Sequence, residues 1–240
     1  MSTCVLVQPV DSPDDFTEVY RCISEAFARQ IQDTIWMSTN PKWDSPEGQK
    51  EGATKLLGRW QSATKNKDGQ PNTVILKATL PDPQDESKRR IVGAAIWSQV
   101  SFVDGHGDRP TNSPDLAALP DTERRFASQM LRSLWKRRVE LAREKASSDS
   151  PALFALDTCA VDPAFQRRGV AGKMVEWGLE EAKRRGGLEC VTEASPMGRI
   201  VYKKLGFRAE GVEKDLIYEV DEEFKHRDKP AILFMRTGAS

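Results

Sequence analysis

The segment from Gln166 to Gly172, with the sequence QRRGVAG, has residue types that could hold a phosphate group. It lies between an apolar run, 151–161, and a helix-like pattern. The first N–H groups of a helix lack intrahelical partners and carry partial positive charge, so they attract anions. The small residues at 169, 171 and 172 would let phosphate oxygens approach the backbone, and Arg167 and Arg168 add charge. The sequence therefore predicts a pyrophosphate cradle, with a tight turn that serves only backbone geometry as the alternative.

Two common phosphate-binding motifs do not fit this segment. A Walker P-loop places Ser or Thr after its Gly-Lys pair, whereas Gly172-Lys173 is followed by Met174. The Rossmann fingerprint needs three spaced glycines, and this segment has alanine at position 171. Nucleotide sites of these two kinds are therefore disfavoured, and the cradle would serve another phosphate-bearing ligand.

Two blocks in the second half of the chain resemble a known family. Residues 161–171, VDPAFQRRGVA, resemble motif A of the GNAT superfamily of acyl-CoA-dependent N-acetyltransferases, and residues 193–207, EASPMGRIVYKKLGF, resemble its motif B. The second block looks most similar to uncharacterised fungal members. The resemblance implies an α/β fold whose mixed, mostly antiparallel central sheet splays at the fourth strand and is flanked by helices. It implies a single GNAT domain over 1–240, with motif A over about 152–185, motif B over about 188–207 and a loop insertion at about 104–120.

The resemblance also implies acetyl-CoA (coenzyme A) as the acyl donor and assigns residues to it. Cys159, Ala160 and Val161 would pair with the pantetheine amides along a strand edge. Ser195, Gly198 and Tyr202 would line the outer side of the pantetheine arm. No metal ligand is implied. The pyrophosphate would bind the turn and the start of the helix, at Gln166, Arg167, Arg168, Gly169, Val170, Ala171, Gly172 and Lys173.

Acyl transfer to an amine needs a base for the amine proton and a proton donor for the departing thiolate. Tyr202 stands at the family's donor position. Asp157 is the candidate base, because a carboxylate inside the apolar run PALFALDTCAV is costly unless it is paired or functional. Burial would raise its pKa, and strand alternation would place it on the face of Cys159 and Val161. The alternatives are a buried hydrogen-bond partner or a binder of the substrate ammonium, since other family members carry Glu two residues earlier, where this chain has Ala155.

The resemblance further implies an acceptor pocket opposite the coenzyme, which here would be an aromatic and apolar wall with Asp157 at its floor. Such a wall beside one carboxylate favours the primary amine of a small aryl- or alkylamine, although tryptophans at such positions commonly pack in a core. Cys159 as a nucleophile and His106 as a substrate contact are weaker alternatives, because Cys159 lies in an apolar strand and histidines are scarce. The expected wall consists of Trp36, Met37, Trp43, Trp97 and Phe102.

The composition limits the remaining classes of function. The 240 residues carry 36 Lys+Arg and 36 Asp+Glu, a balance that argues against a dedicated nucleic-acid binder. Two histidines disfavour multi-histidine zinc sites, and no run approaches the roughly 20 apolar residues of a membrane span. The N-terminus does not resemble a secretion signal, and the four scattered cysteines are typical of reduced thiols. We therefore expect a cytoplasmic monomer or homodimer with no membrane or nucleic-acid partner.

Hydrophobic periodicity predicts the elements that would position these residues. The charged residues of the helix at 121–147 are expected to form a solvated face. The order of the elements predicts one α/β domain with a mixed sheet. Strands are expected at 4–9, 72–80, 90–100, 151–161 and 188–192, with closing strand material at 207–212, 216–220 and 232–236, and helices at about 16–27, 47–65, 121–147, 170–185 and 196–205.

Three functions are compatible with these residues. The first is direct transfer of an acetyl group from acetyl-CoA to the primary amine of a small molecule. The second is a related acyltransferase that uses a longer acyl-CoA or acts on a protein or peptide. The third is a non-catalytic acyl-CoA-binding sensor that retains the fold, against which the presence of Tyr202 and Asp157 argues.

Overall fold

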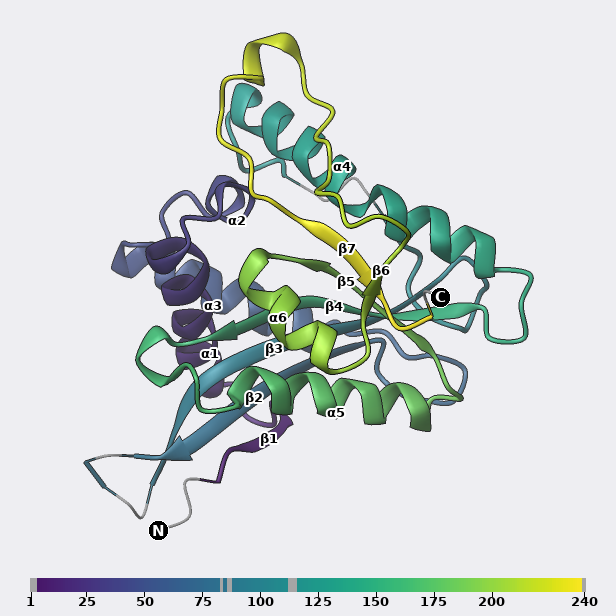
Figure 1. Ribbon diagram of the computed structural model, residues 1–240. Helices are drawn as coiled ribbons and strands as arrows, with labels where there is room; N and C mark the ends of the chain where they lie inside the picture. The colour runs from purple at the N-terminus through teal and green to yellow at the C-terminus, as the bar shows by residue number, and fades with distance from the viewer. Residues whose placement is uncertain (1–3, 83, 86–87, 112–115, 239–240) are drawn as a thin grey trace.

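A twisted, seven-stranded sheet organises the computed structural model, which describes residues 4–82, 84–85, 88–111 and 116–238 (Figure 1). The strand order is β1-β2-β3-β4-β5-β7-β6, and β4–β5 is the only parallel pair among the strands of the described residues. The predicted mixed, mostly antiparallel sheet is therefore confirmed. The strands are β1 (Leu6–Pro9), β2 (Thr73–Pro81), β3 (Arg89–Ser101), β4 (Ala152–Val161), β5 (Glu189–Ala194), β6 (Arg208–Ala209) and β7 (Leu233–Arg236).

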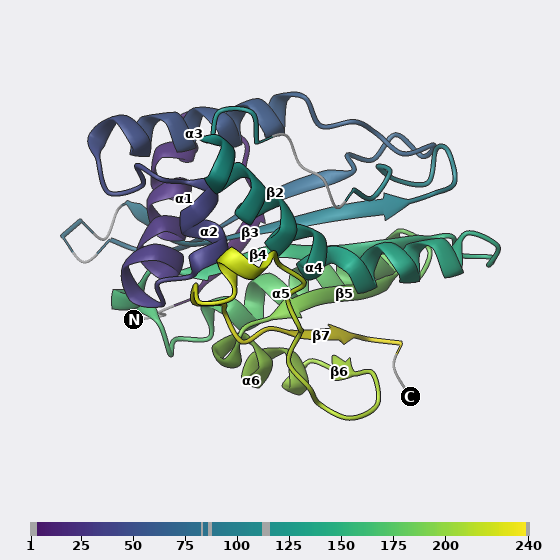
Figure 2. The same cartoon turned by 90° about the horizontal axis from the view of Figure 1, so that it is seen from above.

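Helices cover both faces of the sheet, with α1 and α3 on one side and α5 and α6 on the other (Figure 2). One buried cluster lies under α5 and α6, and further clusters lie under α1, α3 and α4 on the opposite face. No helix in the described part of the chain is both long enough and apolar enough to cross a membrane. The helices are α1 (Asp15–Ser24) with its π-helical continuation η1 (Glu25–Gln30), α2 (Thr34–Thr39), α3 (Pro46–Gln61), α4 (Asp121–Lys145), α5 (Val170–Arg184) and α6 (Pro196–Lys204).

Strand β4 separates from β5 halfway along its length. The parallel pairing runs from Leu153 opposite Glu189 to Leu156 opposite Thr192, and beyond that point β5 continues its pairing with β7. The later residues of β4 pair with β3 alone among the described strands. The sheet therefore opens into a V between β4 and β5, which confirms the predicted splay at the fourth strand.

A β-bulge lies where the two strands part. Ile96 of β3 is opposite Thr158 and Trp97 is opposite Leu156, so Asp157 is the extra residue on β4. A bulge adds one residue and thereby reverses which side chains face which layer. Leu156 and Cys159 consequently both face the core under α5. The expectation that Asp157 shares a face with Cys159 is wrong for this reason.

The segment between β6 and β7 lies along α4 instead of forming another strand. The prediction of strand material at 216–220 is therefore wrong. The Glu219 N–H donates to Ser133 Oγ at 3.0 Å, and Glu219 accepts an ion pair from Lys136 at 2.9 Å. Tyr218 and Val220 pack against the cluster around Phe126, so burial on α4 replaces the missing strand pairing.

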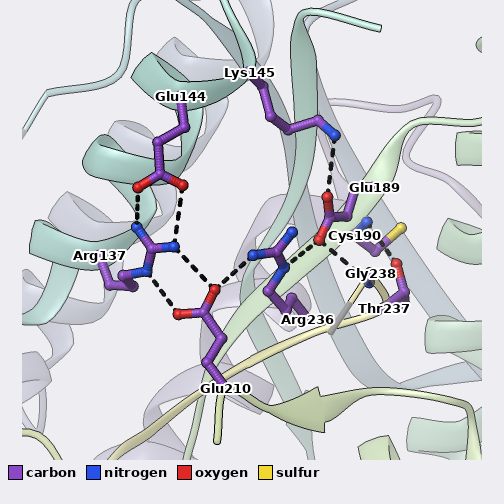
Figure 3. A network of polar contacts seen from close by, with 9 residues as sticks. All are labelled: Arg137, Glu144, Lys145, Glu189, Cys190, Glu210, Arg236, Thr237 and Gly238. Atoms are coloured by element: carbon purple, nitrogen blue, oxygen red, sulfur yellow. Dashed lines mark hydrogen bonds and ion pairs between the residues drawn. The ribbon is translucent and has the colours of Figure 1, made fainter. Parts of the chain in front are cut away.

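A chain of ion pairs fastens the end of α4 to the edge of the sheet (Figure 3). Glu210, next to β6, binds Arg137 at 2.6 Å and Arg236 of β7 at 2.5 Å. Arg236 also binds Glu189 of β5, which in turn accepts a bond from Lys145 at 3.1 Å. These contacts set the position of α4, and with it the inward direction of the neighbouring residue, Arg138.

The short helix α2 lies between two of the predicted helices, at 16–27 and 47–65, where no helix was among the predicted elements. Asp33 accepts a hydrogen bond from the Trp36 N–H at 2.9 Å and starts the short helix α2. A capping side chain thus starts a helix too short for a periodic apolar pattern to reveal. The described part of the 104–120 loop contains no regular helix or strand.

Substitution by alanine should change stability in opposite directions at two helical glycines, the buried Gly178 and the exposed Gly58. In Gly178→Ala the new Cβ would lie 2.1 Å from the buried Trp97 ring, so we expect a loss of ~1–3 kcal/mol in the free energy of unfolding. In Gly58→Ala the Cβ meets nothing within 4 Å, and the better helix propensity should add up to ~1 kcal/mol. Urea unfolding measures both changes, and equal midpoints for the two variants would contradict this packing.

Candidate active site

A cavity of about 500 Å³ occupies the opening between β4 and β5. It extends from the turn before α5, past the edge of β4, to α6 and the π-helical segment η1. Many of the residues predicted to bind the coenzyme therefore lie together around one space. Those in its lining are Cys159, Val161, Gln166, Arg167, Gly169, Val170, Ala171, Gly172, Ser195, Gly198 and Tyr202.

The turn before α5 brings the N-terminus of this helix to the cavity. Gly169 has φ 79° and Arg167 has φ 63°, both in the left-handed region. The Lys173 N–H donates to Gly169 O at 3.0 Å, which is the first hydrogen bond of the helix. The N–H groups of the helical residues before Lys173 therefore have no partner within the helix. A Cβ built on Gly169 or Gly172 would meet no protein atom within 4 Å. The turn thus leaves room for an anion at a backbone with partial positive charge.

Gln166 ties this turn to two other elements. Its amide nitrogen donates to Val161 O at 3.1 Å and to the Gln30 side chain of η1 at 2.7 Å. Gln30 also lines the cavity. The side chain of Gln166 therefore positions the end of β4 and the first-helix region against each other, which is a role beyond contact with a ligand.

Tyr202 reaches the cavity from α6 with its ring buried. Its hydroxyl lies beside the Cys159 thiol, and burial raises the pKa of Tyr202 well above its ordinary value. Burial also raises the pKa of Cys159 to about 12, so this thiol stays protonated and is a poor nucleophile. Gly198 makes room for the ring, because a Cβ there would lie 2.6 Å from it.

Four predicted coenzyme residues have additional or different surroundings. Ala160 is buried toward α1, on the other face of β4 from the cavity. Arg168 lies over the Phe165 ring, and Lys173 makes an exposed ion pair with Glu176 at 2.8 Å. Ser195 lines the cavity and caps α6 by accepting from the Gly198 N–H at 3.2 Å. The side chains of Ala160, Arg168 and Lys173 are not in the described lining of the cavity.

Asp157 lies in an ion-pair network on the opposite face of the sheet. Its carboxylate accepts from Ser98 Oγ at 2.6 Å, from Arg59 of α3 at 2.7 Å and from Arg138 of α4 at 2.5 Å. Burial alone would raise the pKa of Asp157, but the two guanidinium groups and the hydroxyl hold it below the ordinary value. The expectation of a raised pKa is therefore wrong, and Asp157 is an ionised partner of arginines.

Arg138 and Glu193 are the polar residues of this region that the sequence did not single out. The Arg138 side chain is 7% exposed, so the expectation of a solvated α4 face is wrong at this position. Its Nε donates to Glu193 of β5 at 3.1 Å, and a second nitrogen binds the other carboxylate oxygen. The sequence carried little signal for Glu193, since half of the residues in its strand, ECVTEA, are polar.

The tryptophans predicted as an acceptor wall do not form one surface. Trp97 is fully buried and stacks on Phe154 at 5.0 Å, beneath α5, so its assignment to the wall is wrong. Trp36 packs on Tyr20 and Phe27, of which Phe27 lines the cavity. The remaining wall candidates are apart: Trp43 lies under Arg29, Phe102 lies under Arg109 and Arg143, and Met37 is half-buried on α2.

A second cavity, of about 380 Å³, adjoins the first and shares Ile31, Ser195 and Met197 with it. It lies between the start of α2, the start of α6 and the segment before β7. Its lining includes the acidic residues Asp33, whose carboxylate also caps α2, and Asp228, while Ile232 and the prolines contribute apolar surface. The Lys229 ammonium is bound by three backbone carbonyls, so it is engaged away from these carboxylates.

Solved structures with the same fold include several amine acetyltransferases. An agmatine N-acetyltransferase aligns with TM-score 0.61 at 12% identity, covering 97% of this chain and 97% of that chain. Arylalkylamine N-acetyltransferase 2 from Aedes aegypti aligns with TM-score 0.59 at 19% identity, covering 97% of each chain. A mosquito arylalkylamine N-acetyltransferase-like protein, 5b, gives TM-score 0.58 at 12% identity, with 97% of this chain and 98% of that chain covered.

Sequence comparison finds similarity to a known family in the second half of the chain. No curated protein sequence matches the chain. Residues 127–209 match the family described as acetyltransferase (GNAT) domain. This range includes the bulge, the turn before α5 and Tyr202. The chain is therefore similar to the GNAT acetyltransferases over residues 127–209, and its sheet and helices have the GNAT fold.

Proposed function

We propose that this protein transfers an acetyl group from acetyl-CoA directly to the primary amine of a small molecule. The observation that carries the proposal is the cavity between β4 and β5, which connects an anion-accepting helix start to a buried, protonated tyrosine. The residues present fit the coenzyme, because Gly169 and Gly172 leave open space at the turn and the lining beyond it is mostly apolar. Bound acetyl-CoA would supply an activated thioester.

The chain's own residues have separate tasks in this reaction. The amides at the start of α5 hold the pyrophosphate, and Arg167 adds positive charge. Tyr202 donates its hydroxyl proton to the departing thiolate sulfur, since a phenol with a raised pKa is fully protonated at neutral pH. The protonated Cys159 forms no covalent intermediate.

Calorimetric titration with acetyl-CoA, followed by a thiol-release assay over an amine library, tests this function. We expect binding and amine-dependent release of free thiol. Tight binding with no turnover on any amine would instead identify a sensor. Stronger competition by longer acyl-CoA molecules, or turnover only on peptides, would identify the other alternative, a long-chain or protein acyltransferase.

We further propose that the acceptor amine enters through the second cavity. Its Asp33 and Asp228 carboxylates suit an ammonium group, and its apolar residues suit a hydrocarbon body. The solved arylalkylamine and agmatine acetyltransferases of the same fold are compatible with this substrate class. Arylalkylamines are expected to react faster than spermidine or lysine peptides, and equal rates across this panel would contradict the assignment.

Filling the helix start should weaken coenzyme binding without harming the fold. In Gly172→Leu the side chain would enter the open space at the turn, and we expect the Kd for acetyl-CoA to rise roughly tenfold or more, equivalent to ~1.4 kcal/mol. The matched control is Gly58→Leu, a helical glycine with open space on distant α3. Calorimetry measures both, and an unchanged Kd in Gly172→Leu would place the phosphates elsewhere.

A further inference from the structure

Arg90 of β3 and Arg168 of the turn before α5 both lie on the ring of Phe165. The guanidinium carbon of Arg90 is 5.4 Å from the ring centroid and that of Arg168 is 5.3 Å from it, within the range of attraction between a cation and an aromatic face. Arg90 is opposite Leu80, which belongs to the cluster under α5, so its side chain lies on the α5 face of the sheet. Phe165 is buried in the same cluster, whereas both arginines are exposed. A fixed ring therefore holds two positive charges close together at the surface.

The charges of these arginines are not offset within the part of the chain that the structure describes. No carboxylate of the described residues forms an ion pair with Arg90, Arg167 or Arg168. The nearest acidic residue to the turn along the chain, Asp162, is bound by Arg21 at 2.7 Å. Like charges held at one ring repel each other, and an anion between them would remove that repulsion. A phosphate group suits this position, because its oxygens match the planar donors of a guanidinium.

The direction of α5 places this arginine pair beyond the N-terminus of the helix. At its first turn α5 packs on Gly93 of β3, where a Cβ would lie 3.0 Å from Val170. Further along, Gly178 of α5 packs on Trp97, which follows Gly93 on the same strand. The helix therefore runs along β3 in the direction of that strand. Because Arg90 precedes Gly93 on β3, it lies past the start of the helix, at the same end of the sheet (Figure 1).

We propose that Arg90 and Arg168 bind the 3′-phosphate on the ribose of coenzyme A, and that they thereby select a donor that carries this phosphomonoester. The inference rests on the proposed acetyl transfer, in which the pyrophosphate lies at the start of α5 and the pantetheine arm extends into the cavity toward Tyr202. The ribose is joined to the other end of the pyrophosphate, so it leaves the helix start away from the cavity. The arginine pair lies on that side, and the side chain of Arg168 is accordingly absent from the described cavity lining.

The test uses acetyl-CoA and dephospho-acetyl-CoA, which differs from it only by lacking the 3′-phosphate. Calorimetry at one fixed ionic strength gives the Kd of each donor. The wild type is expected to bind acetyl-CoA about tenfold more tightly than the dephospho form, and the variant with Arg90→Gln and Arg168→Gln should bind both equally. Each single variant should lose part of the preference. Because every variant is compared with itself on two donors, a general loss of affinity cancels in the ratio.

Phe102 provides a matched control on the other face of the sheet. Arg109 and Arg143 lie over its ring at 5.4 Å and 5.0 Å, so it also carries two exposed arginines. It packs against the cluster under α4, however, and is absent from the described lining of the cavity. The variant with Arg109→Gln and Arg143→Gln should keep the full preference for acetyl-CoA. If both double variants lost the preference equally, net charge and not a subsite would select the donor, and the inference would be wrong.

The outcomes separate this inference from the function on which it rests. A wild type that binds neither donor would overturn the acetyl transfer itself. A wild type that releases thiol with an amine but binds the two donors with equal Kd would overturn the phosphate subsite alone. A double variant at Arg90 and Arg168 that retained the preference of the wild type would assign the 3′-phosphate to other residues and would likewise overturn the inference.

Discussion

Replacing Tyr202 by Phe is expected to lower kcat by about 10²- to 10⁴-fold while leaving the Kd for acetyl-CoA nearly unchanged. The ring would keep its packing against Phe207, at a centroid distance of 5.8 Å, and only the hydroxyl would be lost. Without that proton donor the thiolate would leave as a poorly stabilised anion. Steady-state kinetics with a thiol-reactive dye and calorimetry of coenzyme binding measure the two quantities.

Tyr20→Phe is the matched control for this variant. Tyr20 is also buried and also uses its hydroxyl, which donates to Asn40 at 3.2 Å, but it lies under α3 away from the cavity lining. Its kcat should equal that of the wild type. The raised pKa of Tyr202 further predicts no loss of kcat through tyrosine ionisation up to about pH 10, the ordinary phenol value. Equal kcat values in the two variants would remove Tyr202 from the mechanism.

Arg138→Met is expected to lower the free energy of unfolding by ~3–5 kcal/mol, because it leaves two buried carboxylates without their shared cation. The guanidinium side chain is 7% exposed, and the Glu193 side chain is 6% exposed. Water cannot replace the lost charge at that depth. Urea unfolding at neutral pH measures the loss, and the deficit should shrink as falling pH protonates Glu193, whose raised pKa lets it neutralise first.

A control on the same helix separates burial from charge. Arg125 pairs with Asp221 and Glu223 on the exposed surface, so Arg125→Met should leave the unfolding midpoint unchanged. The variant that carries Arg138→Met with Asp157→Asn and Glu193→Gln should regain much of the lost stability, since no buried charge then lacks a partner. A triple variant no more stable than Arg138→Met would show that packing of the arginine stem, not its charge, supports the structure.

Local sequence patterns were sufficient for most of the architecture. Periodicity located α1, α3, α4, α5 and the long strands to within a few residues, since amphipathic spacing directly records which face is buried. The turn at 166–172 was also readable, because Gly169 and the small residues around it specify left-handed backbone and close approach wherever they occur. Most residues assigned from the family resemblance line one cavity. Their contacts with coenzyme, the single-domain boundary and the fungal likeness stay predictions.

Other features were decided only by the tertiary structure, because they depend on strand register and on contacts between residues far apart in the sequence. The bulge at Asp157 arises from pairing with β3, and this one extra residue moved the carboxylate to the other face of the sheet from Cys159. Trp97 became core because Gly178 on α5 lets the helix pack directly onto its ring. Sequence determined which residues carry charge and which are apolar. Only long-range packing decided that Arg138 would turn inward to bridge Asp157 and Glu193, because the cost of burying a charge depends on partners brought together by the fold.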